Sequence, residues 1–317
     1  MNKSVGILVI VLAFTVVSCN LKKPSSTPTE GNLEVYCAES VSPAVTQIAN
    51  DFMTLYQKAH INVHPVPTRV AIVKLLNNET TLAVASRPFN QGELDVIKKY
   101  KIDLDTLRVA LDGVVIIVNS ENPIKQINTD QLRDVFTGKT NAWSKLEKGF
   151  QGRIIPALES PNSGTVEFFK NRILGEEKFS EAYPCTTMAH VYSFVRDNES
   201  AIGFISSNWM NSGTVMLPSK KPAPKALEVA EVDSTSMKYV DPNSFGSYYY
   251  PYQAHIYRHY YPLTRPILFL SRDFDGGIAS GFMSFAAGAP GQKIFLNNGL
   301  VPATMPVRLV QLNDQPL

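Results

Sequence analysis

Short runs typical of β-strands alternate along the chain with runs that have the spacing of amphipathic helices, and this alternation limits the possible folds more than any other feature. The strand-like runs are apolar and lie at 33–38, 61–66, 81–86, 107–119, 153–159, 201–206 and 265–271. The helical runs lie at 42–59, 69–78, 91–101, 129–138, 164–175, 190–198 and 277–299. Strands that alternate with helices in this way are typical of parallel sheets with crossover helices.

The alternating series falls into two blocks, which the long run 107–119 joins and which are joined again near 258–270. We therefore expect an α/β fold of two lobes, each a mostly parallel sheet flanked by helices, with two hinge crossings between them. Lobe one is predicted to comprise 33–112 and 260–317, and lobe two 113–259. Open α/β sheets bind ligands beyond the carboxyl ends of their strands, so we expect the binding site in the cleft between the lobes.

The N-terminus indicates export. Lys3 is followed by an apolar run that is too short for a comfortable membrane span but has the length of a signal-peptide core. The run ends in a small residue before Cys19, a pattern that resembles the lipobox of bacterial lipoproteins. We predict a signal peptide at 1–18, lipidation of Cys19 and a polar tether at 19–32; the alternative is an ordinary signal peptide with a coincidental cysteine.

Charge and cysteine content narrow the function further. The formal net charge is +2, with 18% charged residues and no basic cluster longer than two lysines, which argues against nucleic-acid binding. Besides Cys19, the chain contains only Cys37 and Cys185. In an oxidising compartment they could form a disulfide, but a chain of this size does not need one, and two buried free thiols are slightly favoured.

Three polar turns follow strand-like runs at equivalent points of the two blocks. They are 39–43 and 86–89 in the first block, and Pro161–Thr165 in the second. A helix start leaves backbone N–H groups without partners, and Ser, Thr and Gly at that position form either a simple cap or a cradle for an anion. Because these turns from two lobes converge on one cleft, the anion cradle is the favoured interpretation.

At these residues the sequence resembles the phosphate-binding subunits of ABC transporters, which have the type II periplasmic binding protein fold. The resemblance runs from about Leu33 to Leu309. The segments that carry it are TDQLRDVFTGKTNAWSKL, PNSGT, AIGFIS, YPLTRPI and FMSFAAGAPGQKIFLNNGLVP. In that family, hydroxyls and backbone N–H groups of such turns hold the ligand, and a carboxylate accepts the proton of phosphate.

The resemblance implies as ligand-binding residues Ser40, Ser86, Arg87, Ser163, Gly164 and Thr165, and we predict that Glu159 and Asn162 complete the set. It also implies a small anion as ligand, a partner permease with its ATPase, a monomeric protein, and no cofactor, metal or catalytic residue. The location is then the extracytoplasmic side of a bacterial cell envelope, with the N-terminal lipid as membrane anchor.

The sequence departs from the family at several of these positions. Cys37 and Ala38 stand where the family's first turn usually has Gly-Ser, and Glu159 stands where it usually has Arg. Glu159 could accept the ligand's proton while Arg87, with Arg69, supplies countercharge. Arg87 could equally form only a salt bridge between the lobes. Alternatively, the pocket is rebuilt for another solute, because an unpaired buried carboxylate repels a dianion.

We therefore expect a binding protein that captures phosphate or a related small oxyanion. One alternative is a binding protein for a different solute. The other is an extracytoplasmic phosphoester hydrolase with Ser163 or Ser40 as nucleophile. Such a hydrolase needs a base near the serine, and the nearest candidates along the sequence are Lys170 and His190.

Overall fold

The computed structural model describes residues 26–211 and 219–305. Its strands are β1 (Gly31–Ala38), β2 (Ala59–Val66), β3 (Leu82–Ala85), β4 (Asp105–Val118), β5 (Gln126–Asn128), β6 (Ile155–Leu158), β7 (Tyr183–Pro184), β8 (Ala201–Ser206), β9 (Lys225–Ala226), β10 (Glu228–Ala230), β11 (Thr264–Ser271) and β12 (Val301–Pro302). Its α-helices are α1 (Ser42–Leu55), α2 (Thr68–Leu76), α3 (Gln91–Tyr100), α4 (Thr129–Phe136), α5 (Gly164–Phe169), α6 (Met188–Asp197), α7 (Ser207–Asn211), α8 (Gln253–Tyr257), α9 (Ile278–Ala287) and α10 (Ala289–Asn297). Helix and strand alternate as the apolar pattern predicts.

Ten of the strands form one mixed sheet in the order β2-β1-β3-β11-β4-β8-β6-β7, with β9 and β12 paired to β4, and β5 and β10 form a separate two-stranded parallel sheet. β1 is parallel to β2 and β3, and β6 is parallel to β8 and β7. β4 and β11 run antiparallel to their neighbours. The α/β class is confirmed, with parallel strands at both ends and an antiparallel pair in the middle.

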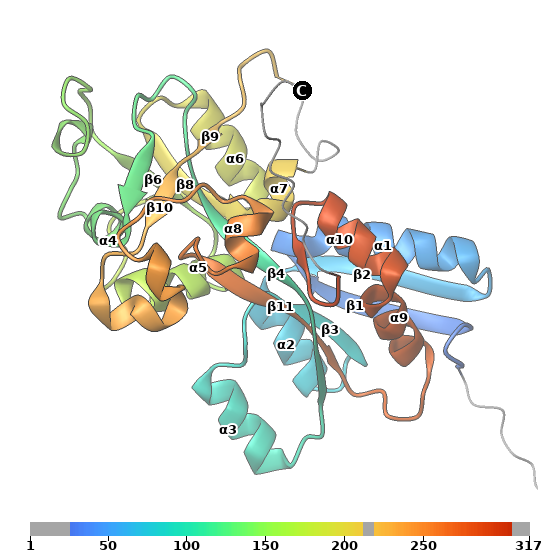
Figure 1. Ribbon diagram of the computed structural model, residues 1–317. Coiled ribbons are helices and arrows are strands. Elements are labelled where there is room, and N and C mark those ends of the chain that lie inside the picture. The colour runs from blue at the N-terminus through green and yellow to red at the C-terminus, as the bar shows by residue number, and fades with distance from the viewer. Residues whose placement is uncertain (1–25, 212–218, 306–317) are drawn as a thin grey trace, which may run out of the picture.

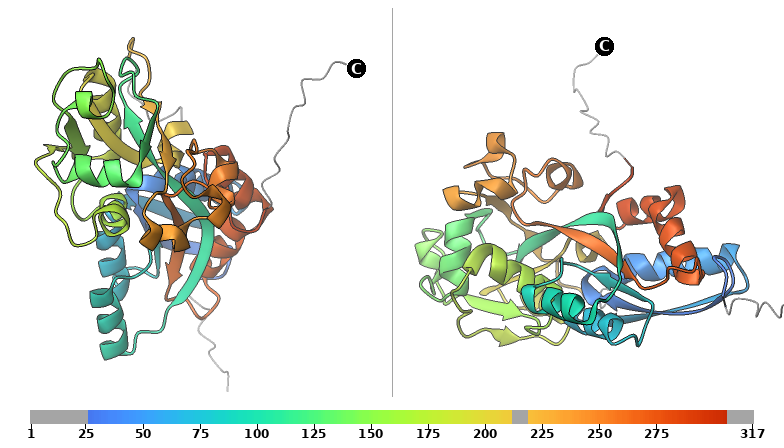
Figure 2. Two further views of the ribbon diagram at one scale, coloured as in Figure 1. Left: turned by 60° about the vertical axis from the view of Figure 1, so that its left-hand side comes forward. Right: turned by 90° about the horizontal axis from the view of Figure 1, so that it is seen from below.

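β4 belongs to both halves of the sheet, as expected of the long run 107–119 that joins the two blocks of the sequence. It pairs with β11 up to Gly113 and with β8 from Val114 onward. Figure 1 shows β4 running diagonally from one half of the molecule to the other, and Figure 2 shows the same crossing from two further sides. The change of partner falls next to the predicted boundary at 112/113, and we keep the terms lobe one and lobe two for the predicted divisions.

Each half has its own apolar core. In lobe one, α1, α9 and α10 cover the sheet, and Phe52 packs edge-on against Phe282. In lobe two, Phe169 stacks on Phe204, and buried Trp143 belongs to the same cluster. These cores hold the strand ends rigidly, so the turns that follow the strands are fixed in space.

The predicted tether ends earlier than expected. Gly31 and Asn32 belong to β1, and the backbone of Pro28 lies against Gly281 of α9, where a Cβ atom would be 1.8 Å from the Pro28 carbonyl oxygen. The signal peptide and Cys19 lie outside the described residues. Among the residues that the structure describes, no helix combines the length and apolarity needed to cross a membrane.

Cys37 and Cys185 are both buried free thiols, the arrangement that the sequence slightly favoured.

Candidate functional site

Four chain turns meet between the lobes, each just beyond a strand. From lobe one come the short 3-10 turn Glu39–Val41 after β1, the start of α2 after β2, and Ser86 after β3. From lobe two comes the segment 159–163 between β6 and α5. Because β1, β2 and β3 are parallel, their carboxyl ends lie at one edge of the sheet, and the turns after them face lobe two.

Gly164 makes the closest approach between the lobes at this site. A Cβ atom on Gly164 would lie 2.2 Å from Thr68 Oγ1 and 2.4 Å from Ser86 Oγ, which is closer than real atoms approach. Those two hydroxyls are hydrogen-bonded to each other, with their oxygens 3.0 Å apart. Glycine is therefore required here because the start of α5 lies directly against hydroxyl groups of lobe one.

Two buried hydroxyls at the site have no hydrogen-bond partner among the described residues. They are Ser40 Oγ and Thr165 Oγ1. Ser163 differs, because its Oγ donates to Glu159 Oε2 (2.9 Å) and accepts from the backbone N–H of Thr165 (3.2 Å), so that Ser163 caps α5. Buried polar groups are rarely left without partners in folded proteins, so the two free hydroxyls point to a ligand.

Two carboxyl groups lie beside these hydroxyls. Burial, together with repulsion from Glu39, raises the pKa of Glu159 to about 7. Burial also raises the pKa of Glu39, although Glu39 Oε1 accepts a hydrogen bond from the backbone N–H of Met188, 3.1 Å away at the start of α6. Glu39 therefore also links lobe one to lobe two.

These residues enclose a small cavity, which we call the hydroxyl cavity. It is lined by Glu39, Ser40, Pro67, Thr68, Glu159, Ser160, Ser163, Gly164 and Thr186. Its volume of 20 Å³ is enough for a water molecule. A tetrahedral oxyanion is larger, so binding one requires the side chains that line the cavity to move.

Arg87 and Asn162, both predicted to contact the ligand, do not line the hydroxyl cavity. Arg87 makes a bidentate ion pair with Glu93 (2.8 Å for both contacts), and its Nε lies 2.5 Å from Glu167 Oε2. Asn90 Nδ2 also donates to Glu167, at 3.2 Å. We call Arg87, Asn90, Glu93 and Glu167 the Arg87 cluster; it is a polar contact between the lobes, and Arg87, Asn90 and Glu167 line a separate cavity of 400 Å³ rather than the hydroxyl cavity.

Asn162 is exposed, and only its backbone contributes at the site. Its carbonyl oxygen accepts a hydrogen bond from the backbone N–H of Arg69, at 3.4 Å. The Arg69 side chain, which the sequence suggested as a source of countercharge, is exposed and does not line the cavity. Of the other predicted residues, Ser40, Glu159, Ser163 and Gly164 line the cavity, and Ser86 and Thr165 are buried beside Gly164 without lining it.

The sequence analysis missed three residues at the site. Glu39 and Thr68 line the cavity, and Thr68 could have been found because it follows Pro67 at a helix start. The third is Arg265, a fully buried residue of β11 whose charge lowers the pKa of Glu159. Asp112 lies opposite Arg265 on the neighbouring strand β4. Because the two residues are far apart in the sequence, their pairing could not be predicted.

Arg265 and Asp112 form an ion pair where the two central strands cross between the lobes. Asp112 Oδ2 lies 2.9 Å from Arg265 Nε and 2.7 Å from its Nη2. Asp112 Oδ1 accepts hydrogen bonds from Ser206 and Ser207 of lobe two. Within the described part of the chain, Arg265 Nη1 has no hydrogen-bond partner.

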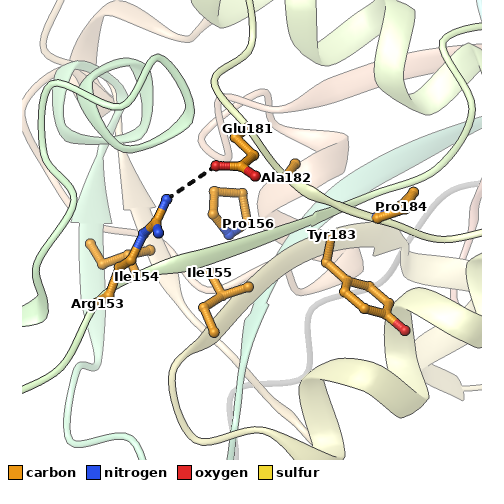
Figure 3. Close-up of a pocket in the computed structure, with 8 residues that line it drawn as sticks. All are labelled: Arg153, Ile154, Ile155, Pro156, Glu181, Ala182, Tyr183 and Pro184. Carbon is orange, nitrogen blue, oxygen red and sulfur yellow. Dashed lines mark hydrogen bonds and ion pairs between the residues drawn. The ribbon is translucent and has the colours of Figure 1, made fainter.

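A larger groove lies on the surface of lobe two, away from this site. Its volume is 340 Å³, and Figure 3 shows the residues that line it, with an ion pair between Arg153 and Glu181. Their charged atoms are 3.5 Å apart, and both side chains are largely exposed. The groove contains an exposed ion pair and small apolar patches, so the converging polar groups identify the hydroxyl cavity as the candidate binding site.

Two α/β lobes, connected by crossing strands and closing over a polar cavity at the strand ends, define a two-lobed solute-binding protein. A family model described as the PBP superfamily domain matches residues 22–289. The chain therefore belongs to the PBP superfamily.

Named relatives fall in the same class. The "Phosphate-binding protein PstS" of Staphylococcus epidermidis is 26% identical over 261 residues, which are 80% of this chain and 74% of the relative. A Clostridium perfringens protein with bound phosphate has a similar structure (TM-score 0.71, 20% identity), and the match covers 86% of this chain and all of the other. An ABC-type phosphate transport receptor from Vibrio cholerae matches with a TM-score of 0.63 and 22% identity over 86% of this chain and 100% of the receptor. The structural likenesses show the fold.

Proposed function

We propose that this protein is an exported solute-binding protein that captures inorganic phosphate in the hydroxyl cavity and delivers it to an ABC permease and its ATPase. The observation that carries the proposal is the convergence of hydroxyls from both lobes on one buried site, where Ser40 and Thr165 have hydroxyls without partners. A ligand with several acceptor oxygens would supply the missing hydrogen bonds.

The chemistry of the site fits phosphate better than sulfate. Hydroxyl donors of Ser40, Thr68 and Thr165 can each bond an oxyanion oxygen. The carboxyl groups of Glu39 and Glu159 need a hydrogen-bond donor on the ligand, and phosphate retains a proton at neutral pH whereas sulfate does not. A site with both kinds of group therefore discriminates between the two anions.

The relatives support the transport role. Two Staphylococcus epidermidis relatives are named as phosphate-binding proteins, and the Vibrio cholerae structure is that of a phosphate transport receptor. Anchoring by a lipid on Cys19 and location in the bacterial cell envelope rest on the N-terminal pattern of the sequence. A monomer is expected, because lobe closure within one chain completes the site.

No contact at the site favours the hydrolase alternative. The Ser163 hydroxyl is hydrogen-bonded to Glu159, and Lys170 is exposed at the far end of α5. His190 accepts a weak hydrogen bond from the backbone N–H of Thr186 through Nδ1, and the Ser193 hydroxyl donates to the His190 backbone carbonyl oxygen. Within residues 26–211 and 219–305, no serine hydroxyl is hydrogen-bonded to the imidazole ring of His190. A serine nucleophile needs an adjacent base, so binding without catalysis is the better supported function.

Calorimetric titration tests this proposal. The purified protein, unfolded and refolded to remove carried ligand, should bind phosphate and give no heat with sulfate. Thr165→Val removes one donor from the buried site and should weaken phosphate binding by about tenfold or more, the cost of one lost hydrogen bond to a charged group. The matched control is Thr106→Val on the exposed surface of β4, which should leave binding unchanged. No binding of phosphate by the refolded protein would reject the proposal.

A further inference from the structure

The hydroxyl cavity has an unusual charge for an anion site. Its lining residues include two carboxyl groups, Glu39 and Glu159, and no basic side chain is recorded among the described residues that line it. The family resemblance places an arginine where this chain has Glu159, so the charge at this position is reversed.

The charge of Arg265, which acts on Glu159, is already neutralised by Asp112. Arg265 lowers the pKa of Glu159, but two of its guanidinium nitrogens face Asp112. The other groups around the two carboxyls add no positive charge. Cys185 is a buried thiol whose pKa burial and Glu159 raise to about 12, and the α6 residue His190 accepts the Thr186 N–H through Nδ1.

A dianion in this cavity would face two carboxylates without a countercharge. Among the described residues, Glu159 accepts a hydrogen bond from Ser163, and Glu39 accepts one from the Met188 N–H. A carboxylate can accept about four hydrogen bonds, so each of the two keeps free acceptor positions. A ligand that carries two O–H groups turns both repulsions into charge-assisted hydrogen bonds. Its remaining oxygens can accept from the free hydroxyls of Ser40 and Thr165.

We propose that the hydroxyl cavity selects the monoanion of a tetrahedral oxyanion that bears two hydroxyl groups, dihydrogen phosphate or its arsenate equivalent. One ligand hydroxyl donates to Glu39 and the other to Glu159, while the two other oxygens accept from protein hydroxyls. The inference rests on phosphate as the proposed ligand and adds its protonation state. It makes the two glutamates specificity-determining residues.

The proposal predicts that binding takes up a proton above neutral pH. There the free phosphate is mostly the dianion and Glu159 is ionised, so forming the complex adds one proton. The dissociation constant should therefore rise about tenfold per pH unit between about pH 7.5 and 8.5. Calorimetry in two buffers with different ionisation enthalpies would count the proton directly, and arsenate should follow the same profile.

Two variants separate this mechanism from a structural effect. Glu159→Gln leaves one carboxyl acceptor, so it should bind phosphate more tightly than the unchanged protein at about pH 8.5 and lose the pH dependence. Glu39→Gln retains an oxygen for the Met188 N–H and should behave in the same way. The control is Glu181→Gln, whose side chain is 89% exposed on lobe two and which should keep the original profile.

The outcomes distinguish this inference from the proposed function. Tight phosphate binding with a dissociation constant that stays level above neutral pH, and without proton uptake, would keep phosphate as ligand and overturn selection of the monoanion. Weaker binding by a folded Glu159→Gln protein at about pH 8.5 would overturn it as well. Absence of phosphate binding at every pH would reject both proposals.

Discussion

Two of the polar contacts between the lobes differ in how fully their hydrogen bonds are satisfied. In the Arg87 cluster, the guanidinium of Arg87 faces Glu93, Glu167 and the carbonyl oxygen of Pro88. At the hydroxyl cavity, Ser40 Oγ of the lining and Thr165 Oγ1, one residue after the lining residue Gly164, are also buried but have no hydrogen-bond partner in the described ranges 26–211 and 219–305. Both regions are polar, buried and shared between the lobes.

This difference separates a structural contact from a binding site. A charged group with all its partners in place can hold two lobes together without a ligand. Buried hydroxyls without partners cost free energy, which is recovered only when a ligand supplies the acceptors. If the hydroxyl cavity binds the anion as we propose, a positive charge between the lobes is a poorer guide to the anion site than a set of small hydroxyl residues.

The largest effect is expected from Arg87→Ala. The substitution leaves Glu93 buried without its cation and Glu167 without its ion pair, so the free energy of unfolding should fall by about 3–5 kcal/mol. Denaturant unfolding at neutral pH measures the loss. The control Arg153→Ala breaks an exposed pair and should cost less than about 1 kcal/mol.

The same variant can also contradict the distinction between the Arg87 cluster as a structural contact and the hydroxyl cavity as the binding site. If Arg87→Ala unfolds like the unchanged protein but loses phosphate affinity by more than about a hundredfold, Arg87 contacts the ligand as the sequence predicted, and the cluster is part of the site.

Gly164→Ala should have the next largest effect, on binding rather than on stability. The new Cβ would collide with Thr68 Oγ1 and Ser86 Oγ and keep the lobes apart. Phosphate affinity should fall by about a hundredfold, equivalent to about 2.7 kcal/mol. Unfolding of the ligand-free protein should change by less than about 1 kcal/mol, because alanine is well tolerated at a helix start.

The control for this change is Gly92→Ala in the exposed helix α3, where a Cβ makes only an ordinary contact. Calorimetric titration of both variants with phosphate makes the comparison. Unchanged affinity in Gly164→Ala would show that bound ligand does not require this close approach of the lobes.

Most of the fold could be predicted from the apolar pattern. The run 107–119 became β4 and the run 42–59 contains α1, because long buried segments show their periodicity in sequence. The two- and three-residue strands such as β7 and β9 were not predictable. Their pairing depends on neighbours that the fold brings together, and such short segments have no period of their own.

The site was predictable where residues of one turn carry the signal. Ser163, Gly164 and Thr165 lie together at a helix start, and the structure places them at the lobe contact. The partners of Arg87 could not be read in the same way, because Glu167 comes from the other lobe. Whether a cation is free or paired is decided by contacts between segments far apart in sequence.

Glu167→Gln should produce the smallest effect and sharpen the comparison most. It removes the ion pair of Arg87 across the lobes but keeps the bidentate pair with Glu93, so no buried charge loses all its partners. The Glu167 side chain is 20% exposed, and the loss of stability should stay below about 1 kcal/mol. Phosphate affinity should fall about threefold, because the substitution removes a contact between the lobes that stabilises their closed arrangement. Calorimetry beside Glu181→Gln measures the change, and equal affinities in the two variants would mean that the Arg87 cluster does not stabilise closure.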